Sequence, residues 1–341
     1  MTALDLSVCF WNYDRTMPLY DGRVPIAGCV PRISILTPEQ AFDRTFVTDE
    51  FDAGELSLSY HLSALARGDA RYVAIPVFPS RSFRHSTIYI RSDCGINSPQ
   101  DLVGKRLGVQ DYDMTAAVVV RGFLRDDYGV SAEQIAWTIG DVESLWRTEI
   151  SVRRVAGVEM STIIGRTLDS MLTNGELDGV IALRPLPSFL KGTGKVVRLF
   201  GDWRRVEQEF FRRTGFFPIM HIVGIRATLV KRYPWLPQSL YSAFVEAKRL
   251  AIGELEQPQV PKVTLPWVSA EVQSTREVMG EDFWPYGVPA NRKAIERFAR
   301  YHVQEGLSDR EIQMNELFPT GAGDGDVKDT PALAQGFLRS G

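Results

Sequence analysis

Apolar residues alternate with small or polar residues in several short stretches of the chain, which is the pattern of β-strands. Val73, Ile75 and Val77 alternate in this way, and so do Ile88 and Ile90 a few residues later. Both stretches are therefore predicted to be half-buried strands. Further strands are predicted at residues 4–10, 32–36, 51–59, 105–110, 135–139, 177–182, 196–200 and 218–226.

Between these strands the apolar residues recur every three or four positions, as they do on one face of a helix. Leu58, Leu62 and Leu65 share such a face, and Gly68 ends the run. The resulting alternation of strands and helices predicts an α/β protein, whose ligand sites lie at the carboxyl ends of the strands. Other helices are expected from residue 38, at 98–104, from Asp113 or Thr115 to Tyr128, and at 167–174, 206–213, 234–255, 272–279 and 291–305.

Two regions show no such period. Residues 140–165 are polar apart from Trp146 and a few scattered apolar positions, and this pattern predicts a loop or lid. The tail after Pro319 is rich in Gly and Asp and is predicted to be disordered.

Composition narrows the class of protein. A chain of 341 residues is long enough for two domains, and its net charge of −3 gives no basic surface for nucleic acid. No segment has the roughly 18 apolar residues of a membrane span, and the N-terminus does not read as a signal peptide. Three cysteines without close pairs argue against a disulfide framework. We therefore expect a cytoplasmic protein, and homo-oligomer formation stays open.

Charged and titratable side chains cluster in the loop between the strand that contains Ile75 and the strand that contains Ile88. This loop carries Arg81, Arg84 and His85 among three serines. Arginine offers a rigid fork for a carboxylate, and histidine can act as an acid near neutral pH. The loop is therefore a candidate anion receptor. The alternative is a solvated basic loop on an exposed hairpin.

The same loop, FPSRSFRHS at residues 78–86, resembles the signature of the 4,5-dihydroxyphthalate decarboxylase family. The likeness extends in family order over most of residues 4–305. The other matching blocks are WNYDRT (11–16), FDAGELSLS (51–59), DLVGKRLG (101–108), MTAA (114–117), PIMH (218–221) and FWPYG (283–287). One departure is Asp113, which stands where an amide is usual and adds negative charge.

The resemblance implies an α/β, two-lobed type II periplasmic-binding-protein-like fold with a ligand cleft between the lobes. We expect lobe 1 to comprise residues 1–108 and 222–315, lobe 2 to comprise residues 109–221, and residues 316–341 to form a C-terminal tail. The chain would thus cross into lobe 2 just after the strand at 105–110 and return on the strand that carries His221.

The resemblance also implies decarboxylation of a hydroxylated aromatic dicarboxylate, foremost 4,5-dihydroxyphthalate to protocatechuate, without a cofactor. Its partner would be this small aromatic carboxylate, not nucleic acid or a membrane. Two alternatives stay open. The chain could decarboxylate a related aromatic acid, or it could be a non-catalytic solute-binding protein for an aromatic acid, although the missing signal peptide speaks against the latter.

Candidate site residues follow from these blocks. His85 is the preferred proton donor ahead of His221, with Asp111 beside it to raise its pKa; Asp14 or Glu55 could also orient a histidine. No metal is expected, although His85, His221 and a carboxylate would be the candidate ligands if one bound. The predicted substrate-binding residues are Arg81 and Arg84 as carboxylate anchors, with Arg15, Asp14, Trp11, Ser57, Ser59, Tyr112 and Thr115.

Overall fold

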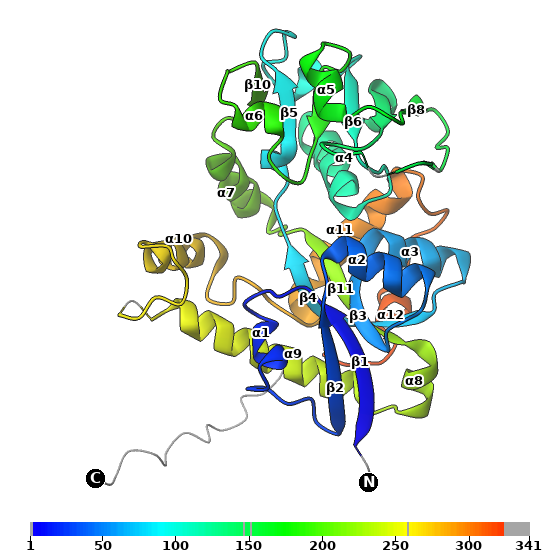
Figure 1. Cartoon of the computed structure of the whole chain (residues 1–341), viewed down its shortest axis with the longest axis vertical. Coiled ribbons are helices and arrows are strands. Elements are labelled where there is room, and N and C mark those ends of the chain that lie inside the picture. The colour runs from blue at the N-terminus through cyan, green and yellow to red at the C-terminus, as the bar shows by residue number, and fades with distance from the viewer. Residues whose placement is uncertain (1–2, 146, 151, 258, 324–341) are drawn as a thin grey trace.

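The computed structural model describes residues 3–145, 147–150, 152–257 and 259–323. Trp146 and the part of the tail from residue 324 onward, both singled out from the sequence, lie outside the described residues. The described chain is built around two β-sheets, one above the other in Figure 1, with helices packed around and between them.

The first sheet has the strand order β2-β1-β3-β11-β4. β1 pairs in parallel with β2 and β3, and β11 runs antiparallel between β3 and β4. Its strands are β1 (Leu4–Phe10), β2 (Cys29–Ile35), β3 (Ala53–Ser57), β4 (Tyr72–Arg81) and β11 (Ile219–Arg226).

The second sheet has the order β10-β5-β9-β6-β7-β8. β9, β6, β7 and β8 are parallel to one another, and β5 lies antiparallel between β9 and β10. Its strands are β5 (Ile88–Arg91), β6 (Arg106–Val109), β7 (Ala136–Ile139), β8 (Met160–Thr162), β9 (Gly179–Ile181) and β10 (Val196–Arg198).

The strand pairing corrects the expected crossing between the sheets. β5 and β6 were both assigned to the first lobe, but they pair in the second sheet, so the chain crosses at residues 82–87. It returns on β11, which begins at Ile219 and not at residue 222. Alternation of apolar residues identifies a strand but not its partner, because pairing depends on residues far away in the chain. The supposed loop at 140–165 also contains a short strand, β8.

The helices begin and end largely where the sequence indicates. α3 (Leu58–Arg67) follows Ser57 and ends at Gly68 in the left-handed conformation, with φ of 76°. α4 (Thr115–Tyr128) follows Met114, so neither Asp113 nor Thr115 is its capping residue. The others are α1 (Met17–Tyr20), α2 (Pro38–Phe42), α5 (Leu168–Thr173), α6 (Pro187–Leu190), α7 (Trp203–Thr214), α8 (Ala227–Arg232), α9 (Leu236–Leu255), α10 (Val268–Met279), α11 (Val288–Gln304) and α12 (Met314–Leu317). No helix in the described ranges is long and apolar enough to cross a membrane.

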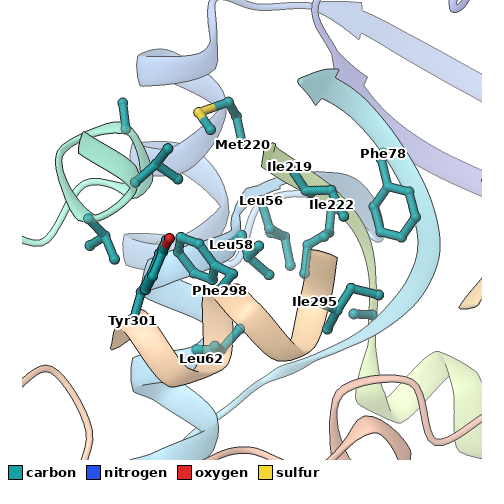
Figure 2. Packing of buried hydrophobic residues seen from close by; sticks show 14 of the residues in the cluster. Leu56, Leu58, Leu62, Phe78, Ile219, Met220, Ile222, Ile295, Phe298 and Tyr301 are labelled. Atoms are coloured by element: carbon teal, nitrogen blue, oxygen red, sulfur yellow. The ribbon is translucent and has the colours of Figure 1, made fainter. Parts of the chain in front are cut away.

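Helix α11 contributes to the core beside the first sheet. Ile295 and Phe298 lie next to Leu56, Leu58 and Leu62 of the β3–α3 unit, as Figure 2 shows. All five side chains are at most 4% exposed. Burial of this size stabilises by roughly 1.5–3 kcal/mol per large apolar side chain.

The carboxyl-terminal half of α11 packs against α4, which follows a strand of the second sheet. A Cβ atom at Gly122 of α4 would lie 2.2 Å from the Tyr301 ring, so the two helices approach closely where glycine stands. Arg121 Nε donates to Glu305 Oε2 at 2.6 Å, and both side chains are 1% exposed. The two sheets are therefore joined through α4 and α11 as well as through the crossing strands.

Candidate active site

His221 lies in the middle of the first sheet, where β11 meets both its neighbours. It pairs with Ser57 at the carboxyl end of β3 and with Ser80 near the end of β4. Residues directly opposite in antiparallel strands place their side chains on the same face. The histidine therefore shares its face with the ends of two strands, which is where open sheets bind ligands.

The pairing of β11 with β4 is irregular at this point. The two residue steps of β11 from His221 to Val223 lie opposite five residue steps of β4, from Ser80 back to Ile75, and this stretch includes Pro76 and Pro79. Proline has no N–H to donate to the ladder, so it is accommodated at bulges and edges. Bulges re-aim the side chains beside them and are common next to active sites. The two prolines thus account for the distorted strand beside the histidine.

The carboxylate of Glu55 is the centre of a hydrogen-bonded cluster. Glu55 lies on β3 and is 0% exposed. Its Oε1 is 2.8 Å from the Tyr13 hydroxyl and 2.5 Å from Nδ1 of His221, and its Oε2 accepts the backbone N–H of Trp11 at 3.3 Å. Three donors from two segments of the chain, the loop after β1 and strand β11, therefore surround one buried carboxylate.

These contacts keep Glu55 ionised and orient the ring of His221. Burial opposes ionisation of Glu55, but His221 and the other donors hold its pKa below the usual range. An ionised carboxylate only accepts hydrogen bonds, so Nδ1 of His221 carries a hydrogen and donates it. Phe42 packs edge-on against the imidazole at 4.9 Å. The ring is thus held by its Nδ1 side, and its other nitrogen has no hydrogen-bond partner among the described residues.

Arg84 supplies a cation on the crossing segment. Its Nε donates to the sulfur of Met220 at 3.2 Å, a weak acceptor, and no carboxylate of the described residues lies within 4.0 Å of the guanidinium. Burial lowers its pKa to about 10, although the charge of Glu207 and the Tyr13 phenol oppose this. The terminal N–H groups of this guanidinium are not paired with a carboxylate in the described part of the chain, so they are suited to bind the carboxylate of a ligand.

His85, the preferred proton donor from the sequence, lies in an aromatic environment. Its ring stacks on Phe123 at 4.2 Å and meets the edges of Phe200 and Phe210 at 5.2 and 5.0 Å. It is 1% exposed, and its nearest carboxylate oxygen, on Glu207, lies 3.9 Å from Nδ1. Burial lowers the pKa of His85 to about 4, so the expectation of a raised pKa is wrong. At neutral pH this imidazole is uncharged.

The carboxylate expected beside His85 has other partners. Asp111 accepts hydrogen bonds from the Tyr60 hydroxyl and from the backbone N–H of Asp113. The neighbouring Tyr112 is 1% exposed and lies under the Arg121 guanidinium, 3.6 Å from the ring centroid. Tyr112 is therefore a core residue, which corrects its assignment to the substrate site.

Arg81 was expected to anchor a carboxylate together with Arg84, but its side chain is 7% exposed. It donates to the side-chain oxygen of Asn291 and lies over the rings of Phe78 and Phe217. Burial lowers its pKa to about 9. These contacts support the fold around β4, so the structure separates the roles of the two arginines.

Arg15 also has a positioning role. Its guanidinium lies 4.2 Å from the ring centroids of both Tyr13 and Trp284, and Nε donates to the Pro79 carbonyl at 2.7 Å. Asp14 takes another of its N–H groups at 3.0 Å and is itself 45% exposed at the side chain. Arg15 thus ties the loop after β1 to the irregular part of β4.

The predicted helix starts do meet across the two sheets. The Thr115 hydroxyl at the start of α4 lies 3.0 Å from the Ser57 hydroxyl and 3.0 Å from the backbone nitrogen of Ser59, which donates to it. The hydroxyl of Ser59 is buried and has no partner among the described residues. The N–H group of the second residue of α3 is therefore bonded to a side chain at the start of α4.

Sequence reasoning missed Tyr13 and Trp284, although both stand in the family-like blocks. Trp284 Nε1 donates to the carbonyl of Phe78 at 2.9 Å, and Gly287 N donates to that of Pro76 at 2.9 Å. The FWPYG block thus holds the irregular strand in place. Tyr13 could have been found from its position, because it follows the first strand at the end where open sheets bind ligands.

Metal ligation finds no support in the described ranges, where no three His, Cys, Asp or Glu side chains gather as a metal would require. Nδ1 of His221 is hydrogen-bonded to Glu55, and the ring of His85 lies among phenylalanines, so the two histidines are not arranged as ligands of one metal.

No protein-family model matches the chain. Among solved structures, it resembles the aliphatic sulphonate binding protein SsuA of Escherichia coli, with a TM-score of 0.51 and 13% identity over 93% of this chain and 91% of that one. The alkanesulfonate-binding SsuA of Xanthomonas axonopodis pv. citri gives a TM-score of 0.51 and 13% identity, over 94% and 98%. Likeness at this identity establishes the fold, which is the two-lobed fold of type II periplasmic binding proteins.

Curated relatives are much more similar. The chain is 44% identical over 320 residues to the 4,5-dihydroxyphthalate decarboxylase of Comamonas testosteroni, covering 93% of this chain and 97% of the relative. It is 41% identical over 218 residues to the enzyme of that name from Pseudomonas putida, covering 63% and 84%. The chain therefore belongs to the 4,5-dihydroxyphthalate decarboxylase family.

Proposed function

We propose that this protein removes one carboxyl group from 4,5-dihydroxyphthalate and releases protocatechuate and carbon dioxide. The observation that carries the proposal is the 44% identity to a 4,5-dihydroxyphthalate decarboxylase over almost the whole length of both chains. The arrangement of His221, Glu55 and Arg84 fits the needs of this reaction.

The substrate supplies the electrons for its own decarboxylation. Each of its hydroxyl groups is para to a carboxylate, so an ionised hydroxyl pushes electron density toward the carbon that bears that carboxylate. A proton added to this carbon makes it tetrahedral, and the bond to the carboxylate then breaks. Carbon dioxide leaves, and the electrons of the broken bond restore the aromatic ring. The hydroxyl gives its proton to water before this step and regains one from water afterwards. The net requirement is therefore one proton delivered to the ring of a substrate that carries two carboxylates, and no electron-accepting cofactor is required.

Arg84 is the proposed anchor for the carboxylate that stays on the ring. It approaches the weak acceptor Met220, and no carboxylate of the described residues lies within ion-pair distance. A bidentate bond to the substrate would use its remaining donors. Arg81, the other predicted anchor, is bonded to Asn291 within the core, which favours Arg84 alone.

His221 is the proposed proton donor, in place of His85. Its Nδ1 is bonded to Glu55, which orients the ring and stabilises the positive charge of the imidazolium form. The other nitrogen, Nε2, is the one left to face the substrate. His85 is unsuited to this role because its pKa of about 4 leaves it uncharged at neutral pH.

The test is incubation of the purified protein with 4,5-dihydroxyphthalate, following carbon dioxide and protocatechuate together. We expect both products in equal amounts, with turnover unchanged after dialysis against a chelator. His221→Asn should abolish most of this turnover, since general acid catalysis contributes about 10²–10⁴-fold. Binding of 4,5-dihydroxyphthalate by the wild type without release of carbon dioxide would overturn the proposal and favour a solute-binding protein.

A further inference from the structure

The side chain of Tyr13 is held in one position by contacts on several sides. It lies in the loop after β1, where its backbone carbonyl accepts the N–H groups of Thr16 and Met17 at 3.0 and 2.9 Å. The centroid of its ring lies 4.2 Å from the Arg15 guanidinium, which also lies 4.2 Å from the centroid of the Trp284 ring. A phenol with so little freedom is able to orient the group that its hydroxyl touches.

The group it touches is the carboxylate that holds the proposed proton donor. The Tyr13 hydroxyl donates to Oε1 of Glu55 at 2.8 Å, and His221 Nδ1 lies 2.5 Å from the same oxygen. Burial, reinforced by the charge of Glu55, raises the pKa of Tyr13 well above its usual value. The phenol therefore keeps its hydrogen and acts only as a donor to the carboxylate.

From this geometry we infer that Tyr13 is a positioning residue, which sets the orientation of His221 through Glu55. The inference rests on the proposed function, in which His221 delivers the proton. Without the phenol hydroxyl, the fully buried Glu55 loses one of its three donors and is free to turn its oxygens. The imidazole then loses the fixed partner that aims it. The substrate itself does not lose a contact, so binding is preserved while turnover falls.

The chain offers a matched control. Tyr20 lies seven positions further on, and its hydroxyl donates to the backbone carbonyl of Phe10 instead of to Glu55. Tyr13→Phe and Tyr20→Phe thus remove the same atom from two tyrosines, and only the first change removes a donor from the carboxylate.

The kinetic test compares the two variants with 4,5-dihydroxyphthalate as substrate. We expect Tyr13→Phe to lower kcat about 10- to 100-fold, the effect of one hydrogen bond to a charged group, with KM within about threefold. Tyr20→Phe should keep kcat within about threefold of the wild type. In a Glu55→Gln background the further loss from Tyr13→Phe should be less than about threefold, because the phenol acts through that carboxylate. A rise in KM as large as the fall in kcat, or equal effects of the two variants, would overturn the inference.

A second readout does not depend on turnover. In the substrate-free wild type, the Nδ1 proton of His221 should give a strongly downfield NMR signal, identified by its loss in His221→Asn. This signal should shift or disappear in Tyr13→Phe and stay unchanged in Tyr20→Phe. If the wild type proved unable to decarboxylate the substrate, the proposed function would fail, yet the NMR comparison would still decide whether Tyr13 orients His221. An unchanged signal in Tyr13→Phe would exclude that role.

Discussion

The buried carboxyl of Glu207 should make the stability of the folded chain depend on pH. Glu207 lies on α7, is 7% exposed, and burial raises its pKa from 4.5 to about 7. The folded state therefore holds this proton more tightly than the unfolded state. Stability from this group is fully present below about pH 4.5 and is lost as pH rises through about 7. At 1.36 kcal/mol per pH unit, the loss amounts to at most about 3 kcal/mol.

Glu207→Gln imitates the protonated carboxyl at every pH. We expect it to exceed the wild type in unfolding free energy by less than about 1 kcal/mol at about pH 5 and by up to about 3 kcal/mol at about pH 8.5. Denaturant unfolding at both values measures the difference. Glu209→Gln on the same helix is the control, since the Glu209 side chain is 55% exposed and its replacement leaves the buried carboxyl of Glu207 in place.

His85, 3.9 Å away, should act in the opposite direction. Its pKa is lowered from 6.5 to about 4, so the stability it contributes is present above about pH 6.5 and is lost as pH falls through about 4. If Glu207→Gln gained as much stability at about pH 5 as at about pH 8.5, the carboxyl would be ionised in the folded state at both values, and this reasoning would be refuted.

Three further outcomes are expected. Arg84→Lys keeps the charge but loses the fork, so it should weaken inhibition by benzoates about tenfold, and unchanged inhibition would place the anchor elsewhere. His221→Asn should lower turnover at least about 100-fold, whereas His85→Phe should keep it within several-fold because neither ring nitrogen of that histidine has a hydrogen-bond partner in the part of the chain that the structure describes; the reverse result would restore His85 as the donor. Gly122→Ala would place Cβ 2.2 Å from an aromatic ring of α11 and should cost roughly 1–3 kcal/mol in thermal unfolding. Gly253→Ala, which meets nothing within 4 Å in α9, should gain up to about 1 kcal/mol, and equal effects would contradict the close packing of the two helices.

The local elements could be predicted because their signals are local. β1 and β11 coincide with apolar runs, and Gly68 and Gly129 end α3 and α4 in the left-handed conformation that glycine adopts most easily. The crossing between sheets could not be predicted in the same way. β5 pairs with β9 and β10, about 90 to 110 residues further along the chain, and nothing in its four residues specifies those partners.

The candidate site was predicted in part for a related reason. His85 follows two arginines and reads as polar surface, but Phe123, Phe200 and Phe210 enclose it from distant parts of the sequence. His221 stands in an apolar run and reads as core, yet the pairing of β11 with β3 brings it to Glu55. Composition was therefore misleading for His85, because long-range packing decides which ring is buried. For His221 it would have misled as well, but the sequence analysis named this residue as a candidate despite its apolar neighbours.

Glu55 and Arg84 do not pair with each other, and this affects how the site would bind an anionic substrate. Glu55 receives its hydrogen bonds from neutral Tyr13 and the backbone of Trp11, together with His221. It therefore does not need Arg84 to offset its burial, and no ion pair joins the two. An arginine already paired with a protein carboxylate would have to give up that partner to a substrate, which costs much of the gained energy. Here the carboxylate serves the imidazole, and the guanidinium is left for an incoming carboxylate, as the proposed decarboxylation requires.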